Sequence, residues 1–212
     1  MLSTFKKLPE NKQNALLNAA AKVFAKKGYY HANISEICKK AGISNGALYK
    51  YFKNKESLYL SVFDYIIDIV SKELFLKHLD SPGPVYLIIQ NILNGLVVLA
   101  KNHPEMVAIY VDIGSCSMNK LSAPLAEKME GKAKEFWMEL VRRGRQKGEI
   151  KTKFSDEGLA YYIDNHITLL AYSLASKYFD TRFRVYFGGK SKEVTDQEKI
   201  RTIIKSMQVV LE

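Results

Sequence analysis

The residues best suited to a chemical role lie in one segment, 33–52, which combines lysines with small polar side chains. Its pattern predicts two short helices joined by a tight turn at Gly42, because glycine adopts the backbone conformation that such a turn requires. The second helix offers serine, asparagine, alanine and lysine side chains, which suit the base edges in the major groove of DNA. The segment therefore predicts a helix-turn-helix unit.

The charge distribution supports this prediction. Residues 1–56 hold eleven lysines and three acidic residues, a net charge of +8, and the whole chain of 212 residues carries +10. A basic patch confined to one segment attracts the phosphates of a nucleic acid, although a solvated lysine-rich surface is the alternative. The first arginine of the chain is Arg142, so the segment lacks the side chain that most often reads guanine.

Helices must position these residues, because apolar side chains recur at helical spacing along nearly the whole chain and almost no strand pattern occurs. We predict an all-α fold of about nine helices, with a three-helix DNA-binding domain at 1–55 and a larger helical domain at 56–212. Capping boxes are expected where Asn33 and Thr195 each precede a glutamate by three positions. The expected helices cover about residues 10–27, 33–41, 44–52, 55–78, 85–101, 122–147, 155–178 and 195–211, and a further helix begins at about residue 104.

The remaining features exclude several function classes. The four histidines are isolated, and the sequence has no Ser-His-Asp spacing, phosphate-cradling glycine loop or cluster of metal ligands, so we expect no enzyme, no cofactor and no metal. Cys38 and Cys116 lie far apart, which suits a reducing compartment. The N-terminus has no apolar signal core, and the most apolar stretch, around 96–100, is too short and interrupted to span a bilayer. We expect a soluble cytoplasmic protein.

Four motifs between residues 10 and 60 follow one another in a distinctive order. They are Ala19-Ala-Ala-Lys-Val-Phe-Ala-Lys-Lys-Gly-Tyr29, Ile34-Ser-Glu-Ile37, Ala41-Gly-Ile-Ser-Asn-Gly-Ala-Leu-Tyr-Lys-Tyr-Phe52 and Lys55-Glu-Ser-Leu58. This series resembles the TetR family of bacterial transcriptional regulators, whereas the chain after residue 60 is similar to the family in helix number and length alone. The resemblance implies a homodimer with an N-terminal helix-turn-helix, a C-terminal domain that holds a small-molecule pocket, and a dimer interface formed by the last two long helices.

The resemblance also assigns DNA contacts. Asn33, where many relatives have threonine, and Lys55 would lie at phosphates, Tyr49 would reach the backbone, and the helix after Gly42 would enter the major groove. On that helix the amide of Asn45 suits adenine and the ammonium of Lys50 suits guanine. Because long polar side chains are few, we expect DNA shape to contribute to specificity. The predicted DNA-binding residues are Asn33, Ser44, Asn45, Gly46, Ala47, Tyr49, Lys50 and Lys55, of which Ser44 is first a helix cap.

The last two predicted helices would expose a large apolar surface if each packed alone. The helix at 195–211 has a one-sided apolar stripe, and the helix at 155–178 is apolar on two sides. A two-fold dimer would cover this surface, although both helices could instead fold back on their own protomer. A pocket for a hydrophobic ligand is expected among the helices between Val85 and Tyr178. Its candidate lining residues, each of which could instead be plain core, are Met106, Tyr110, Trp137, Tyr161, Asn165 and His166.

Together these features predict a homodimeric repressor that binds a palindromic DNA operator and is released by a small, hydrophobic ligand. The alternatives within this class are a regulator that activates and one that responds to no ligand. A non-specific architectural DNA-binding protein is a further alternative, although a helical domain of this size is more than such a role requires.

Overall fold

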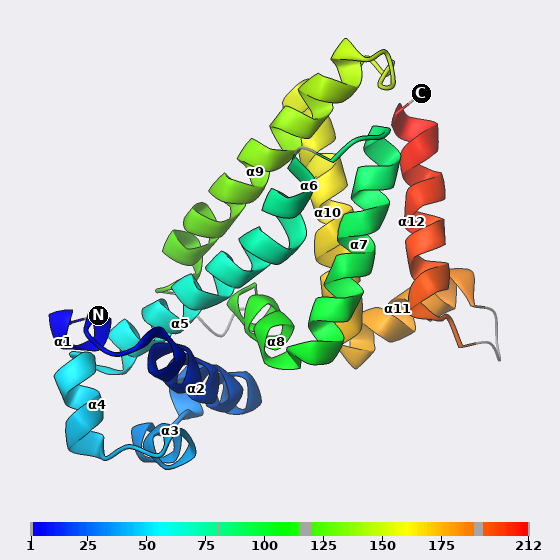
Figure 1. Ribbon diagram of the computed structural model, residues 1–212. Helices are drawn as coiled ribbons and strands as arrows, with labels where there is room; N and C mark the ends of the chain where they lie inside the picture. The colour runs from blue at the N-terminus through cyan, green and yellow to red at the C-terminus, as the bar shows by residue number, and fades with distance from the viewer. Residues whose placement is uncertain (1, 80, 115–119, 189–192, 212) are drawn as a thin grey trace.

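The computed structural model describes residues 2–79, 81–114, 120–188 and 193–211, which form helices and their connecting loops with no strand among them, as predicted (Figure 1). The N-terminal head contains α1 (Ser3–Lys6), α2 (Glu10–His31), α3 (Ile34–Ala41) and α4 (Asn45–Tyr51). The body begins with α5 (Lys55–Val70), which continues through the π-helical segment η1 (Ser71–Leu76) into α6 (Lys77–Leu79). It then contains α7 (Val85–Asn102), α8 (Pro104–Ile113), α9 (Ser122–Gln146), α10 (Asp156–Ala175), α11 (Lys177–Phe187) and α12 (Asp196–Leu211).

Polar side chains fix where several helices begin. The Asn33 side chain accepts a hydrogen bond from the Ser35 amide, and Ser44 accepts one from the Ala47 amide. These bonds satisfy amide groups that a helix start leaves without partners. The capping box predicted at Thr195 is confirmed: its amide donates to the Glu198 carboxylate at 2.9 Å and its hydroxyl accepts from the Glu198 amide at 3.2 Å.

One local prediction needs correction. Glu36 does not complete a capping box with Asn33, because its carboxylate pairs instead with the Lys27 ammonium at 2.5 Å. The regular winding of the first long helix ends at Gly28, in agreement with the prediction over 10–27, because Gly28 has a non-helical backbone with φ of 69°. The chain continues past this kink in a further turn, and α2 ends at His31.

Two helices differ from those predicted. α1 precedes the first predicted helix and buries Phe5 completely, with its ring centroid 4.8 Å from that of Phe52. The helix predicted over 155–178 ends at Ala175, and a separate helix, α11, covers Lys177–Phe187. Cys38 is buried in the head, and Cys116 lies outside the described residues.

One hydrophobic core joins the head to the body. The head helix α2 packs against α5 and α8 of the body. In the body, α10 is central, since it packs against α7, α8, α9, α11 and α12 (Figure 1). By length and composition α7 would be able to cross a membrane, but its apolar side chains Ile88, Ile89 and Ile92 are buried in this core.

The apolar stripe of α12 packs within its own protomer. Ile200, Ile203, Ile204 and Met207 are buried, and α12 lies along α7. The argument that this stripe awaits a partner subunit is therefore wrong, because the same chain already covers it. Most of the exposed apolar side chains lie on other elements, and α11 holds four of them: Tyr178, Val185, Tyr186 and Phe187.

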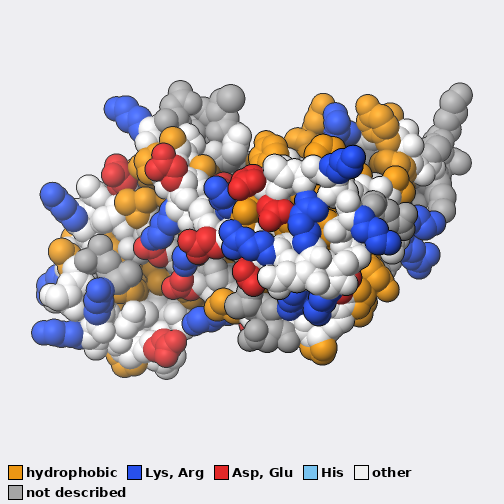
Figure 2. All heavy atoms as spheres, turned by 90° about the horizontal axis from the view of Figure 1, so that it is seen from above, with side chains coloured by type: hydrophobic (Ala, Val, Ile, Leu, Met, Phe, Trp, Pro, Cys, Tyr) orange, Lys and Arg blue, Asp and Glu red, His pale blue; other side chains and the backbone are white. Residues whose placement is uncertain are grey.

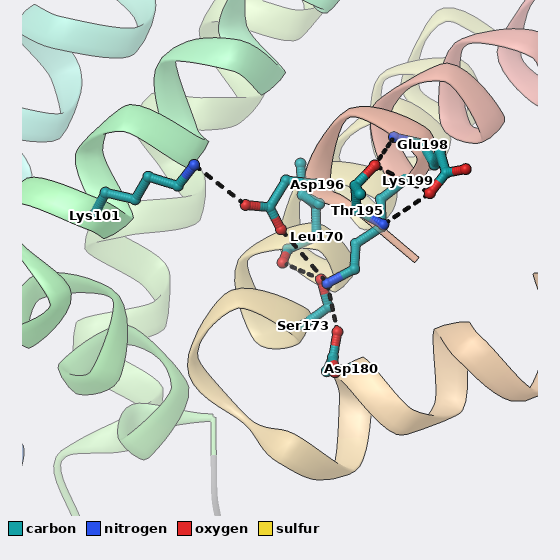
Figure 3. A network of polar contacts seen from close by, with 8 residues as sticks. All are labelled: Lys101, Leu170, Ser173, Asp180, Thr195, Asp196, Glu198 and Lys199. Carbon is teal, nitrogen blue, oxygen red and sulfur yellow. Dashed lines mark hydrogen bonds and ion pairs between the residues drawn. The ribbon is translucent and has the colours of Figure 1, made fainter. Parts of the chain in front are cut away.

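A buried lysine anchors the start of α12 (Figure 3). The Lys199 side chain is 3% exposed, and its ammonium lies 2.6 Å from the Asp180 carboxylate of α11 and 3.7 Å from that of Asp196. Asp196 in turn lies 3.6 Å from the Lys101 ammonium at the end of α7. These ion pairs connect α7, α11 and α12 at one end of the body.

Candidate DNA-binding surface and ligand cavity

The helix α4 presents its polar side outward at the end of the head away from the main body (Figure 1). Leu48 and Phe52 are fully buried and fix the helix to the head. Because these anchors occupy the inner side, the candidate DNA-reading side chains are left at the surface. Ser44, Asn45, Gly46, Tyr49 and Lys50 are exposed, and Ala47 is partly buried.

A shallow concavity brings together four of the predicted DNA-binding residues, Asn33, Asn45, Tyr49 and Lys55. The Asn45 amide donates to the Ser35 hydroxyl at 3.0 Å, which links α4 to the start of α3. Ser44, Gly46, Ala47 and Lys50 also lie on α4 but do not line this concavity. Tyr30, which the sequence allows either to pack or to reach DNA, lies in the same concavity and is 57% exposed.

Lys55 is held in place by the end of α2. Its ammonium donates to the carbonyl oxygens of Tyr30 at 3.0 Å and Ala32 at 3.3 Å, and it lies 5.0 Å from the centroid of the Tyr29 ring. An ammonium has three N–H groups, so these two bonds leave one for a further acceptor. A phosphate oxygen suits that position.

The short helix α1 packs against the C-terminal end of α4. The Leu2 amide donates to the Tyr51 carbonyl at 2.9 Å, and the Thr4 hydroxyl donates to the Lys50 carbonyl. The Phe5 ring packs against both aromatic residues at the end of α4. Apolar residues at Leu2, Phe5 and Leu8, three positions apart, are the sequence signal by which this helix could have been found.

The body contains a cavity of ≈ 950 Å³ between α8, α9 and α10, which we call the outer cavity. It adjoins a smaller apolar space of ≈ 110 Å³, the inner chamber, lined by side chains of α5, η1, α7, α8, α9 and α10. The two spaces share five lining residues: Tyr110, Met129, Glu130, Asp164 and Thr168.

Most of the residues predicted to line a pocket lie on these spaces. Tyr110, Trp137, Tyr161 and Asn165 line the outer cavity, and Met106 lines the inner chamber. The prediction for His166 differs from the structure. His166 lies two positions after Asp164, which turns it by about 200° on a helix, and so it faces a separate groove formed with α11 and α12.

Two acidic side chains meet in the outer cavity. The carboxyl groups of Glu130 and Asp164 are hydrogen-bonded to each other, and Asp164 also accepts a hydrogen bond from the Trp137 indole at 2.7 Å. Burial, with the negative charge of Asp164, raises the pKa of Glu130 to about 7, and burial also raises the pKa of Asp164. At neutral pH Glu130 is therefore partly protonated, and the pair carries less than its full negative charge. Glu130 was not predicted, because it lies among other charged residues of α9.

Two elements connect the cavity with the head. The helix that begins at Lys55 contributes Ile66, Val70 and the η1 residue Leu74 to the inner chamber. Another η1 residue, Phe75, lies against Phe136 and Trp137, with ring centroids 5.0 and 5.6 Å away. The second element, α8, lines both spaces and packs against α2 of the head.

Sequence comparison finds matches over the head and beyond it. The profile of bacterial regulatory proteins, tetR family, matches residues 16–62. An uncharacterized HTH-type transcriptional regulator of Bacillus subtilis, YuxN, is 29% identical over 78% of this chain and 58% of that protein, so this chain spans less than two thirds of that relative. The HTH-type transcriptional repressor BepR of Brucella suis is 25% identical over 70% of this chain and 73% of that protein.

Solved structures share the fold. FadR of Bacillus subtilis, in complex with stearoyl-CoA, has a TM-score of 0.70 at 16% identity and covers 93% of this chain and 98% of its own. AibR, in complex with isovaleryl coenzyme A and operator DNA, has a TM-score of 0.67 at 15% identity over 92% of this chain and 97% of its own. At these identities the likeness concerns the arrangement of helices.

Proposed function

Because the chain belongs to the tetR family of bacterial regulatory proteins, we propose that it is a homodimeric transcriptional repressor that a small ligand releases from a palindromic operator. One observation carries the proposal: a single helix joins the two candidate sites. The first residue of α5, Lys55, lies on the DNA-facing concavity, and the same helix continues into η1, which lines the inner chamber.

In this proposal α4 enters the major groove. The exposed side chains of Asn45 and Lys50 read base edges, and the small residues Gly46 and Ala47 let the helix approach them closely. Asn33, Tyr49 and Lys55 bind the phosphate backbone and hold the helix in register. The net charge of +8 in residues 1–56 supports this assignment, since it places positive charge where phosphates would lie.

A dimer would bury the apolar surface at the end of the body opposite the head. Hydrophobic side chains gather at the right-hand end of the molecule in Figure 2, where α11 and α12 lie in Figure 1. The exposed apolar residues of α10, α11 and α12 that would be available for such a contact are between 47% and 77% exposed: Leu169 on α10, Tyr178, Val185, Tyr186 and Phe187 on α11, and Val209 on α12. Pairing through this end places two reading helices on one DNA, with half-sites ~34–36 Å apart or a multiple of that distance.

Release follows if the ligand binds the two states of the protein unequally. A ligand in the inner chamber contacts η1 and α8, and both elements lead to the head. Movement of either would change the spacing of the two reading helices in the dimer. Two proteins that share this fold were solved with acyl-CoA ligands, which supports a small-molecule role for the cavity.

Selection of bound fragments from random duplex DNA by the purified protein tests this proposal. We expect a palindromic sequence bound ~10³-fold or more above random DNA. Steep salt-dependent binding without an enriched sequence would contradict a specific repressor and favour an architectural DNA-binding protein. Reporter transcription from the selected site then separates repression from activation.

A further inference from the structure

The outer cavity is acidic although the chain as a whole carries a charge of +10. One lysine, Lys134, lines it, together with four acidic residues: Glu127, Glu130, Glu157 and Asp164. The inner chamber adds Lys132, whose ammonium lies 3.8 Å from the Asp68 carboxylate. An acidic cavity attracts cations and repels anions, and it does so here against the overall charge of the protein.

The Glu130–Asp164 pair forms the polar centre of this space. Both side chains line the outer cavity and the inner chamber, so a ligand that enters either space meets them. Two carboxyl groups in contact cannot both ionise easily, and below the raised pKa of Glu130 they therefore share one proton. An ammonium group placed between them would replace that proton and donate charge-assisted hydrogen bonds to both. A phosphate in the same place would face like charge.

The residues around the pair suit a cation that carries an apolar group. Four aromatic residues line the outer cavity, Tyr110, Trp137, Tyr161 and Tyr172, and aromatic faces attract cations as well as hydrocarbon. The inner chamber adds buried aliphatic side chains, among them Ile67, Leu96 and Ile109. The cavity thus combines a site for positive charge with a surface for an apolar group.

We propose that the ligand of this regulator is a lipophilic amine, with its ammonium group between Glu130 and Asp164 and its apolar part against the aromatic wall and the inner chamber. The proposal rests on the regulatory function proposed above and names its ligand class. It separates this chain from the two structural neighbours solved with acyl-CoA, whose coenzyme phosphates are anions.

The single tryptophan of the chain, Trp137, lines the cavity and donates to Asp164, so its fluorescence reports binding directly. Decylamine, decanol and decanoyl-coenzyme A are titrated at pH 7, below their aggregation concentrations. We expect decylamine to bind at least ~10-fold more tightly than decanol, because an ion pair in a desolvated site adds to the shared apolar contact. Decanol binding as tightly as decylamine, or decanoyl-coenzyme A binding more tightly, would overturn the proposal.

Two matched variants on α9 assign the effect to the pair. Glu130→Gln should abolish the preference for the amine over decanol. Glu139→Gln makes the same charge change on the same helix, but Glu139 is 60% exposed, pairs with Arg142 at 3.7 Å and lies outside the cavity, so it should keep the preference. A preference that survives Glu130→Gln refutes the assignment. Should that variant fail to fold, Asp164→Asn replaces it.

Proton release provides a second readout. Amine binding near pH 6.5 should release close to one proton per protomer, measured by calorimetry in two buffers of different ionisation enthalpy. The other titratable groups that line the two spaces are Glu127, Lys132, Lys134, Glu157, Tyr110, Tyr161 and Tyr172. Glu139→Gln should keep this release and Glu130→Gln should lose it. Amine binding without proton release would overturn the shared-proton site.

Operator binding by the same samples separates the two proposals. Specific operator binding without amine preference removes only the ligand assignment. Amine preference without any selected operator removes only the repressor function.

Discussion

The crossing between α9 and the start of α7 yields a stability prediction with an internal control. A Cβ atom added at the buried Gly144 would lie 2.6 Å from Ile150 Cδ1 and 2.7 Å from Val85 Cγ2, whereas normal carbon contacts are about 3.5–4.0 Å. Neither neighbour can retreat easily. The Val85 amide donates to the Glu149 carboxylate at 2.6 Å, and the Ile150 amide donates to the Gly144 carbonyl at 3.3 Å.

The expected magnitude follows from two opposed effects. Gly144→Ala gains about 1 kcal/mol of helix propensity. Overpacking against two held neighbours costs about 2–3 kcal/mol, the upper part of the usual range. The variant should therefore be less stable than the wild type by roughly 1–2 kcal/mol.

Gly131→Ala on the same helix is the control. A Cβ atom at Gly131 meets no atom within 4 Å, so the substitution should stabilise the protein by about 1 kcal/mol. Urea unfolding at one protein concentration, followed by circular dichroism, gives the midpoints of both variants. Equal stability of the two alanine variants would show that the α9–α7 crossing has room for a methyl group and would refute the reasoning.

Four further predictions concern other parts of the molecule. Phe5→Ala should cost about 3 kcal/mol in thermal unfolding, because it removes a fully buried ring behind α4. Lys199→Met should be nearly neutral and Lys199→Ala should cost about 2 kcal/mol in the same assay, because methionine retains the apolar contacts of the buried stem. Lys55→Met should reduce the slope of log K against log salt by about 2 per dimer in an operator titration, if each protomer loses one phosphate contact. Since the folded state keeps the proton of Glu130 that the unfolded state releases, stability should fall as pH rises from the usual glutamate range through about 7, and Glu130→Gln should flatten this fall in pH-dependent melting.

Features of the head that depend on local chemistry could be predicted from the sequence. The helix starts at Asn33 and Ser44 follow from side chains that cap their own helices, and the turn follows from Gly42, which adopts φ of 68°. These interactions join residues close in the chain, so their spacing contains the information.

Features of the body that depend on tertiary contacts could not be predicted in this way. The meeting of Glu130 with Asp164 requires α9 and α10 to lie side by side, and the sequence around Glu130 reads as an ordinary charged helix face. The stripe of α12 did indicate a buried face, but periodicity cannot say whether the covering surface belongs to the same chain or to another. The position of His166 could have been predicted, since helical geometry separates it from Asp164.

The π-helical segment η1 lies between the reading head and the cavity, and its winding has a mechanical consequence. Its hydrogen bonds span five residues instead of four, so it holds one more residue per turn than an α-helix would. If this turn were rewound as α-helix, the extra residue would pass to a neighbouring turn, and one side of the helix would advance by about 1.5 Å and rotate by about 100° relative to the other. Such a change would alter the length and the rotational phase of the helix in one step without losing a turn. Leu74 and Phe75 belong to this π-helical segment and line the inner chamber, so a ligand that contacts them acts on the segment where the rewinding would occur.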